Sequence, residues 1–540
     1  MDLPGLDRLS GPLFLGRTLV RAGLVRAERP DRLVRALDVL RRWGPTIAAG
    51  YSAGAIRRPD AVAIVDERGT LTFAEIDRRT NALARALTEH GVRAGDGVAV
   101  LARNHRWFVE ASVAIGKVGA NALYLNTMFA APQIADVCDR EQPVAIIHDE
   151  EFAAFVAQAA MGRERLVAWS DHPDPDGAPT LEDLIVGRSD APLDPPPAPG
   201  RVVILTSGTT GTPKGAQRKQ PDSLAPVAAL LDAIPLHARE RTMIAAPMFH
   251  SWGMAHFLIA MSLGSTLVVR RRFDPEDTLA AIAHHRTTAL AVVPVMLQRI
   301  VELPDDVVAK YDCSSLRVIA VSGSALPGEL ALKVMDRFGD VLYNLYGSTE
   351  VAWATIAGPG DLRAAPGTAG RPPHGTVVRL FDEHGDDVPD GVTGRIFVGN
   401  ELAFDGYTGG GGKEVLAGLM STGDVGHFDQ DGRLFIDGRD DEMIVSGGEN
   451  VFPREVEDLL AEHPGVVEVA VLGVPDETWG ERLRAFVVPV DGMGITAQDL
   501  QEHVRENLAR YKVPREVVFL DELPRNPTGK VLKRTLAEHP

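Results

Sequence analysis

From residue 61 onward, short apolar runs alternate with longer segments in which apolar residues recur every three to four positions. The short runs have the length of strands, and the longer segments have helical spacing. Strands are predicted at residues 61–65, 97–101, 144–148, 201–205, 243–246, 265–269, 289–293 and 316–322, and helices at 73–89 and 107–118. Repeated alternation of strand and helix predicts an α/β fold, with mixed, mostly parallel sheets and flanking helices.

The rhythm changes after Gly375. Strands predicted at 377–382, 394–398 and 433–437, with turns such as Asp431-Gly432, indicate a small antiparallel subdomain. The segment from Arg439 onward has predicted helices at 455–462 and 497–510 and predicted strands at 466–474, 483–490 and 517–520. We therefore predict a large N-terminal domain over residues 46–438 and a smaller mobile α+β lid domain over 439–540, with the boundary near Asp440 and Asp441.

The first 45 residues form a third segment, in which arginines alternate with leucine and valine. The arginines are Arg17, Arg21, Arg26, Arg29, Arg32, Arg35, Arg41 and Arg42. A basic amphipathic helix can lie on an anionic membrane surface. The alternative is a helix packed on the main body with its arginines in water, and we favour that alternative. Peripheral membrane contact through residues 1–45 stays open.

Composition excludes several classes of protein. The chain has 540 residues, which suggests more than one domain, and a net charge of −18, which argues against nucleic acid as the main partner. Cys138 and Cys313 are far apart and suit neither a disulfide framework nor a zinc site, so a reducing cytoplasm is expected. Neither a run of about 18 apolar residues nor a signal peptide is recognisable. The sequence leaves the oligomeric state open, with a homodimer as one option.

Residues 206–215 read TSGTTGTPKG and follow the predicted strand 201–205. Glycines let the backbone bring its N–H groups close to a ligand, while hydroxyl groups and a lysine add donors and positive charge. The spacing differs from that of a Walker A loop. We predict a polyphosphate-binding loop rather than a flexible surface turn. Its binding residues are Thr206, Ser207, Gly208, Thr209, Thr210, Gly211 and Lys214.

Further motifs follow this loop in a definite order. They are APMFH at 246–250, VSGSA at 321–325, YNLYGSTE at 343–350, STGD at 421–424, GRDDEMIVSGG at 438–448 and PTGK at 527–530. Together they resemble the adenylate-forming, or acyl-activating, superfamily, from about Tyr51 to Arg534. The segment 438–455 followed by PTGK is most similar to bacterial fatty acyl-CoA synthetases.

The resemblance implies a reaction in two steps. A carboxylate attacks the α-phosphate of ATP to give acyl-AMP and pyrophosphate, and coenzyme A then displaces AMP. It implies that Lys214 and its loop hold the β- and γ-phosphates, that Thr349 contacts the α-phosphate, and that Glu350 binds Mg²⁺. Magnesium keeps several waters and relies on substrate phosphates, so one carboxylate is enough. The alternative for Glu350 is a solvated loop acid.

The nucleoside side of the site is also implied by the resemblance. Tyr346 would present its ring to adenine and Asn344 its amide. Asp424 would accept both ribose hydroxyls, unless it only caps an Asx-turn. Arg439 would face the ribose and phosphate, with a surface salt bridge as the alternative. Backbone positions complete the pocket: Gly323, Ser324 and Gly347.

The lid carries the remaining implied roles. Lys530 of PTGK would enter the active site during adenylation and bridge carboxylate and phosphate. Asp441 would be the hinge about which the C-terminal domain rotates between the two steps. Gly447 and Gly448 would line the pantetheine passage, because residues without side chains permit close approach.

The acyl pocket is the least specified part. His250 is predicted to flank the carboxylate channel, against the alternative of a core histidine. Wall candidates, which are equally readable as core, are Trp252, Met254, Phe257, Val295 and Trp353. Val445 stands where aryl-acid ligases and luciferases often have lysine, which removes some support for an aromatic acid. The apolar wall candidates favour an aliphatic tail, so a medium- or long-chain fatty acid is predicted. The alternatives are an acyl-AMP ligase that loads a carrier protein and a catalytically silent acyl or nucleotide sensor.

Overall fold

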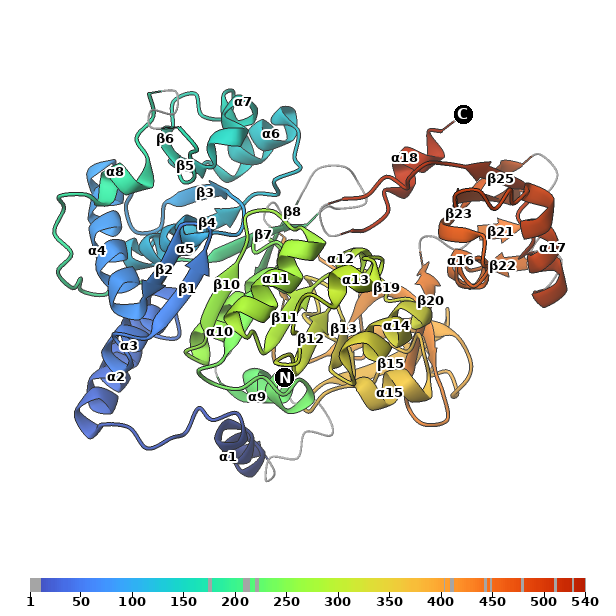
Figure 1. The fold of residues 1–540 in the computed structure, drawn as a ribbon, viewed down its shortest axis with the longest axis horizontal. Helices are drawn as coiled ribbons and strands as arrows, with labels where there is room; N and C mark the ends of the chain where they lie inside the picture. Colours follow the sequence, from blue (N-terminus) through green and yellow to red (C-terminus); the bar gives the residue numbers. More distant parts are fainter. Residues whose placement is uncertain are drawn as a thin grey trace.

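The computed structural model describes residues 11–172, 177–206, 214–218, 223–402, 404–407, 412–440, 444–446, 449–476, 480–508, 512–526 and 529–539. Figure 1 shows a large body and a smaller unit, in orange and red, at its right-hand edge. Mixed parallel and antiparallel sheets with flanking helices make up the body, and the smaller unit has a sheet of its own. This architecture confirms the predicted fold class.

An eight-stranded sheet runs through the middle of the body in the order β14-β13-β12-β11-β9-β10-β1-β2. Six of these strands are parallel to their neighbours, and β2 and β14 are antiparallel edges. The strands are β1 (Val62–Asp66), β2 (Gly69–Thr72), β9 (Arg241–Ile244), β10 (Thr266–Val269), β11 (Ala289–Val292), β12 (Val318–Val321), β13 (Leu342–Tyr346) and β14 (Thr355–Ala357). Because helices cover both faces, β11 (ALAV) and β12 (VIAV) are apolar throughout.

A seven-stranded sheet follows the order β17-β8-β7-β4-β3-β5-β6. Its strands are β3 (Gly97–Leu101), β4 (Asn121–Tyr124), β5 (Ala145–His148), β6 (Glu164–Val167), β7 (Val202–Thr206), β8 (Lys214–Arg218) and β17 (Phe404–Tyr407). One continuous core joins residues of both sheets with helices α3 (Ile47–Arg57), α4 (Phe73–Glu89), α5 (Arg106–Val118) and α10 (Ser251–Ser262). Helix α4 has the predicted bounds because a capping box, Thr72 with Glu75, sets its first turn.

The remaining helices of the body cover the outer faces or connect strands. They are α6 (Ala131–Glu141), α7 (Ala153–Val156), α8 (Leu181–Ile185), α9 (Ala225–Ala233), α11 (Pro275–His285), α12 (Pro294–Val301), α13 (Asp305–Val308), α14 (Gly328–Phe338) and α15 (Pro359–Ala364), with a short 3-10 turn at Glu150–Phe152. Helices α11, α12 and α14 accompany the second core, which is centred on β11, β12 and β13.

Two smaller sheets complete the fold. An antiparallel sheet contains β15 (Val377–Phe381), β16 (Gly394–Gly399), β18 (Val415–Leu416), β19 (Leu419–Phe428) and β20 (Leu434–Arg439). The C-terminal sheet contains β21 (Ile444–Ser446), β22 (Glu449–Val451), β23 (Val466–Asp476), β24 (Gly480–Pro489) and β25 (Glu516–Phe519). Its core includes residues of α16 (Pro453–Ala461) and α17 (Ala497–Asn507), and α18 (Lys533–Ala537) packs near β23.

The N-terminal segment differs from the single helix that the arginine pattern suggests. It forms two helices, α1 (Gly11–Arg21) and α2 (Pro30–Trp43). Gly23 ends the first with a φ of +73°, and Pro30 begins the second at a position where its missing N–H costs nothing. Helix α1 packs on α9, and α2 packs on α3. In the described part of the chain, no helix combines the length and apolar character needed to cross a membrane.

Candidate active site

Four neighbouring parallel strands, β9, β11, β12 and β13, end at the same edge of the central sheet. The segments that leave them carry His250 after β9, Val293 and Val295 after β11, Gly323 after β12 and Glu350 after β13. Ligands of α/β proteins bind outside the carboxyl ends of such strands. The fold therefore gathers motifs from four distant parts of the sequence at one edge.

Two glycines at this edge meet conditions that other residues could not. Gly323 has a φ of +101°, and a Cβ there would lie 3.3 Å from Cγ1 of Val293. At Gly347 a Cβ would lie 2.3 Å from the carbonyl oxygen of Ala352. Bare backbone thus forms this part of the edge, as expected for a wall against which a flat ligand packs. Asn344 is buried in β13, and Ser324 is half-buried beside Gly323.

Thr349 and Glu350 lie half-buried in a tight turn after β13. The hydroxyl of Ser348 accepts hydrogen bonds from the backbone N–H groups of Glu350 (3.2 Å) and Val351 (3.4 Å) and so shapes this turn. Among the described residues, no group of three or more histidine, cysteine, aspartate or glutamate side chains is placed to hold a metal ion.

Tyr346, Asp424 and Arg439 form a connected polar group. The hydroxyl of Tyr346 donates to Oδ2 of Asp424 at 2.5 Å, and Nε of Arg439 lies 3.4 Å from Oδ1 of Asp424. Burial raises the pKa of Asp424, and the charges of Arg439, Lys530 and Lys413 oppose this shift. Burial, with the charge of Asp424, also raises the pKa of the Tyr346 hydroxyl well above its usual value. The tyrosine hydroxyl is thus a neutral donor that orients the carboxylate.

The local backbone at Asp424 is a bulge rather than the turn that STGD suggests. Strand β19 continues through the motif, and Asp424 pairs with Arg439 on β20. On the other side, the pairing of β16 with β19 jumps from Phe397↔Ser421 to Arg395↔Val425. The extra residues on β19, with Gly423 at a φ of +79°, bend the strand. Such bulges re-aim side chains next to functional sites.

Lys530 reaches this region from the lid. Its side chain is exposed, and its charge acts on the buried carboxylate of Asp424. The loop is closed by two hydrogen bonds of 2.9 Å between Asn526 and Lys530. Gly529 is buried with a φ of +80°, and a Cβ there would lie only 2.4 Å from Cγ1 of Val295. The lysine loop therefore packs on Val295 in the first turn of α12. Val293, two residues earlier in the chain, contacts Gly323.

The phosphate-loop prediction falls partly outside the described residues. Thr206 ends β7, and Lys214 begins β8 and pairs with Thr206 across an antiparallel hairpin. Lys214 is thus a strand residue, whereas the sequence suggested a loop. Not described are Ser207, Gly208, Thr209, Thr210, Gly211, the hinge Asp441, Gly447 and Gly448.

The predicted acyl wall is only partly at the site. Nε1 of Trp252 donates to the carbonyl of Val292 (3.0 Å), so this indole is held in the core. Met254 and Phe257 belong to the core between the two sheets. Val295 contacts the lysine loop instead. Trp353 is half-buried, and its Nε1 donates to the hydroxyl of Thr376 at 3.1 Å.

His250 lies at the N-terminal end of α10. Its Nε2 is buried without a hydrogen-bond partner among the described residues, and its ring lies 4.6 Å from that of Phe249. Burial lowers the pKa of His250 to about 4, so the imidazole is neutral. An unpartnered buried nitrogen suits a ligand that supplies the missing hydrogen bond.

Sequence reasoning missed three residues of this region: Val293, Lys413 and His256. No sequence pattern identifies Val293, whose only sign is its contact with Gly323. The same holds for Lys413, whose charge acts on the carboxylate of Asp424. His256 is almost fully buried, both of its ring nitrogens lack a partner among the described residues, and its ring lies 4.4 Å from Trp252. It occupies an apolar helix, where a lone histidine gives no signal of its own.

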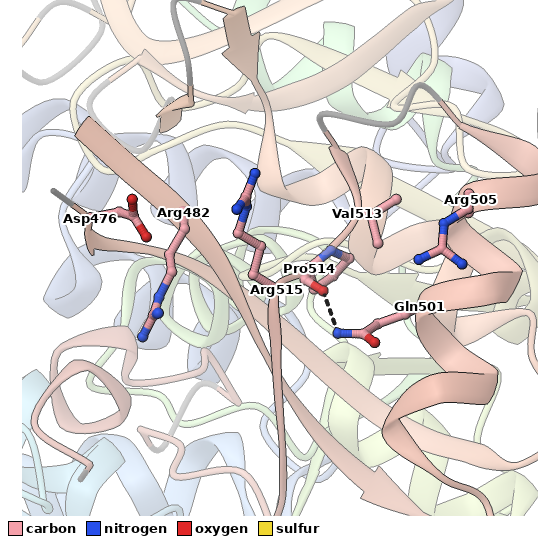
Figure 2. A pocket seen from close by; sticks show the side chains of 7 residues that line it. All are labelled: Asp476, Arg482, Gln501, Arg505, Val513, Pro514 and Arg515. Atoms are coloured by element: carbon pink, nitrogen blue, oxygen red, sulfur yellow. Dashed lines mark hydrogen bonds between the residues drawn. The ribbon is translucent and has the colours of Figure 1, made fainter. Parts of the chain in front are cut away.

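The lid also carries a pocket of its own, of about 720 Å³, far from the predicted nucleotide site in sequence (Figure 2). Its walls come from β23, β24, α17 and the segment before β25. The lining residues are Asp476, Arg482, Gln501, Arg505, Val513, Pro514 and Arg515. Arg482 pairs with Glu516 (2.9 Å), and Arg505 pairs with Glu502. The pocket is thus lined by three guanidinium groups, at least two of them paired with carboxylates, and by the carboxylate of Asp476.

Comparison with known proteins agrees with the geometry. Residues 52–408 match the AMP-binding enzyme family, and residues 455–530 match the AMP-binding enzyme C-terminal domain. A feruloyl-CoA synthase from Amycolatopsis sp is 36% identical over 493 residues, covering 90% of this chain and 98% of that protein. The indoleacetate–CoA ligase of Aromatoleum aromaticum is 36% identical over 485 residues, with 88% and 94% covered.

A long-chain-fatty-acid–CoA ligase of Mycobacterium tuberculosis, FadD13, is 30% identical over 482 residues, covering 87% of this chain and 93% of its own. Among solved structures, an anthranilate CoA ligase, AuaEII, in complex with anthranoyl-AMP has a TM-score of 0.80 and 25% identity, with 91% and 96% covered. ATP, Mg²⁺ and coenzyme A are the expected substrates and cofactor of such proteins. The chain belongs to the AMP-binding enzyme family, within the adenylate-forming superfamily.

Proposed function

We propose that this protein is an AMP-forming acid–CoA ligase. A carboxylate oxygen of the acid attacks the α-phosphorus of ATP, and pyrophosphate leaves; the thiolate of coenzyme A then attacks the acyl carbon, and AMP leaves. The observation that carries this proposal is the seating of the Lys530 loop on Val295, with the lysine charge acting on Asp424. In this proposal Lys530 of the lid and Asp424 of the body, whose carboxylate binds the ribose, contact the same nucleotide.

Each residue has a defined task in this proposal. Asp424, oriented by Tyr346 and Arg439, accepts hydrogen bonds from the ribose hydroxyls. Lys530 stabilises the negative charge that develops between the carboxylate and the α-phosphate, which is usually the largest contribution to such catalysis. Thr349 donates to the α-phosphate. Glu350 holds Mg²⁺, which supplies positive charge at the phosphates when bound.

The second step requires the lysine to leave. We place the hinge at Asp441 and treat residues 439–540 as a lid that rotates, with Gly447 and Gly448 lining the pantetheine passage. The pocket around Arg515 gives the lid a cationic surface, and coenzyme A carries several phosphates. We therefore expect Arg515→Ala to raise the KM for coenzyme A while adenylation stays unchanged.

The acid is proposed to be an apolar carboxylic acid, with aromatic acids as the first class to test. The two relatives at 36% identity are named for ferulate and indoleacetate. Met254 and Phe257 are core residues, which removes part of the argument for an aliphatic channel. Trp353 and His250 are half-buried flat side chains that can pack against an aromatic ring. A medium- or long-chain fatty acid remains the second candidate, favoured by the relationship to FadD13.

The proposal is tested with the purified full chain, ATP and Mg²⁺, and a panel of ferulate, indoleacetate and saturated fatty acids of graded length. Pyrophosphate release followed by AMP release on addition of coenzyme A supports it, and the preferred acid gives the substrate class. AMP release with a holo carrier protein but not with coenzyme A would identify a carrier-protein ligase. No pyrophosphate with any acid would favour a nucleotide or acyl sensor.

We also propose a cytoplasmic location. Cys138 and Cys313 are both free thiols, and the first is buried. Free cysteines of this kind persist in a reducing compartment.

A further inference from the structure

Exposed apolar side chains gather at the N-terminal segment. Twenty large apolar side chains are exposed in the described part of the chain, and seven of them lie between residues 13 and 40. They are Leu13, Val20, Val25, Leu33, Val34, Leu37 and Leu40. The match to the family model begins at residue 52, so this segment lies outside the matched residues. Such a concentration of exposed apolar surface marks an interaction site.

Helix α2 has two faces with different roles. Ala36 is buried against α3, and Nη1 of Arg32 donates to the carbonyl of Arg57 at 3.2 Å, so this side holds the helix on the body. Leu33, Leu37 and Leu40 follow one another at helical spacing and are 39%, 55% and 41% exposed. They form an apolar stripe along the border of the packed side, because Leu33 and Leu40 lie three and four residues from Ala36. Val34, 66% exposed, widens this stripe.

The charge of the segment is opposite to that of the whole protein. Residues 11–43 contain eight arginines against Glu28, Asp31 and Asp38, a net charge of +5 in a chain of −18. Glu28 is paired with Arg57 and Arg239 of the body. Among the arginines with largely exposed side chains, Arg41 (77%) lies beside Leu37 around the helix, Arg29 (69%) precedes the first turn, and Arg35 (63%) lies on the opposite side from the stripe. Arg29 and Arg35 pair with Asp31, and Arg41 pairs with Asp38. A leucine stripe with Arg41 at its border, on a segment of net positive charge, matches the boundary between acyl chains and anionic headgroups.

We propose that α2 docks this protein on an anionic lipid bilayer, with the leucine stripe in the interface and the arginines at the lipid phosphates. If α2 faced only water, or bound an acidic protein surface, the exposed arginines would be explained. Neither environment would explain four exposed apolar residues in one stripe. Docking of one short helix is reversible, because its buried apolar area is small. The proposal concerns a surface outside the catalytic site and does not rest on the identity of the acid.

The test is co-sedimentation of the full chain with vesicles of phosphatidylcholine containing about one third phosphatidylserine, at low and high salt. The wild type is expected to bind these vesicles, to bind pure phosphatidylcholine at least about tenfold more weakly, and to be released by salt. Leu37→Ser combined with Leu40→Ser, and separately Arg29→Glu combined with Arg41→Glu, should each weaken binding by at least about tenfold.

The matched control is Met161→Ser, because Met161 is 71% exposed but lies outside the N-terminal segment. It should leave vesicle binding unchanged. ATP-dependent pyrophosphate release without vesicles should be the same in all variants, which shows that they are folded. Should the double leucine variant lose that activity, Leu37→Gln alone serves in its place.

Three results would overturn the proposal. The first is failure of the wild type to sediment with anionic vesicles. The second is wild-type binding that is equally strong to neutral and to anionic vesicles, or binding of the double leucine variant that is as strong as that of the wild type. The third is a dimer in sedimentation equilibrium that Leu37→Gln dissociates while vesicle binding persists, because the stripe would then be a contact between two copies of this chain.

Discussion

The two halves of the candidate active site are built in different ways. In the body, segments after β9, β11, β12 and β13 meet because those strands are hydrogen-bonded neighbours above a large apolar core. In the lid, the site contribution is a hairpin loop, which Arg525 supports by donating to the carbonyl of Gly529 (2.5 Å) and pairing with Glu468 (3.0 Å). The loop meets the body through the contact of Gly529 with Val295.

This difference teaches how one chain can serve two steps. Strand ends cannot move without breaking sheet hydrogen bonds and exposing core, so the body half of the candidate site keeps its shape. A glycine resting on a valine separates at small cost, so the lysine loop can leave without unfolding either unit. Lids of this kind often control turnover.

The largest effect should come from the moving half. Lys530→Ala removes the charge that reaches the nucleotide site, and we expect acyl-AMP formation to fall by about 10²–10³-fold or more. Thioester formation from supplied acyl-AMP should be retained. Pyrophosphate release and CoA-dependent AMP release measure the two steps separately. Lys533→Ala, next to the loop, is the control; equal loss of both steps in Lys530→Ala would contradict the assigned role.

The fixed half should show a smaller but still large effect. Asp424→Asn keeps the size of the side chain and removes the charge held between Tyr346 and Arg439. A hydrogen bond to a charged group contributes about 1.5–3 kcal/mol, so the KM for ATP should rise by about 10–100-fold. Tyr346→Phe removes only the hydrogen bond that orients Asp424, so it should raise the KM for ATP by a smaller factor. An unchanged KM for ATP in both variants would remove Asp424 from the ribose site.

The contact between the two halves can be altered by one methyl group. Gly529→Ala adds a Cβ that would lie 2.4 Å from Val295 and should slow adenylation by about tenfold, while thioester formation from acyl-AMP persists. Gly492→Ala is the matched control, because Gly492 also has a positive φ (+79°) but no neighbour within 4 Å of the new Cβ. Partial rescue by Val295→Ala is expected; equal effects of the two glycine variants would assign the loss to backbone strain.

The smallest expected effect is on the pH dependence of stability, which reports whether the buried ring of His256 in the body is shielded from water. Burial lowers the pKa of His256 to about 4, whereas an unfolded histidine titrates near 6.5. Between these values the unfolded state binds more protons, so stability should fall as pH falls, by at most about 3 kcal/mol. His256→Leu should flatten this slope in urea unfolding at both ends of the window. His384→Gln, at an exposed site, should leave it intact, and an unchanged slope in His256→Leu would mean that the ring is hydrated.

Much of the local structure could be predicted from the sequence. Helix α4 begins at Phe73 because Thr72 and Glu75 form a capping box, and β3 matches the predicted run 97–101. The motif residues Tyr346, Asp424 and Arg439, which the sequence singled out separately, lie together in the structure. The bulge at Asp424 has no local signal in the sequence, and for Met254 and Phe257 the sequence left core and acyl wall open, with the structure placing both in the core.

The sequence by itself therefore determined where strands, helices and reactive side chains lie along the chain. Only the tertiary structure decided which of them meet: that the ends of β9, β11, β12 and β13 share one edge, that Val295 lies against Gly529, and that the leucine stripe of α2 remains exposed. The physical reason is that local preferences act over a few residues. Contacts between distant segments depend on strand order and on the volume left between packed elements, and neither is written at any single position.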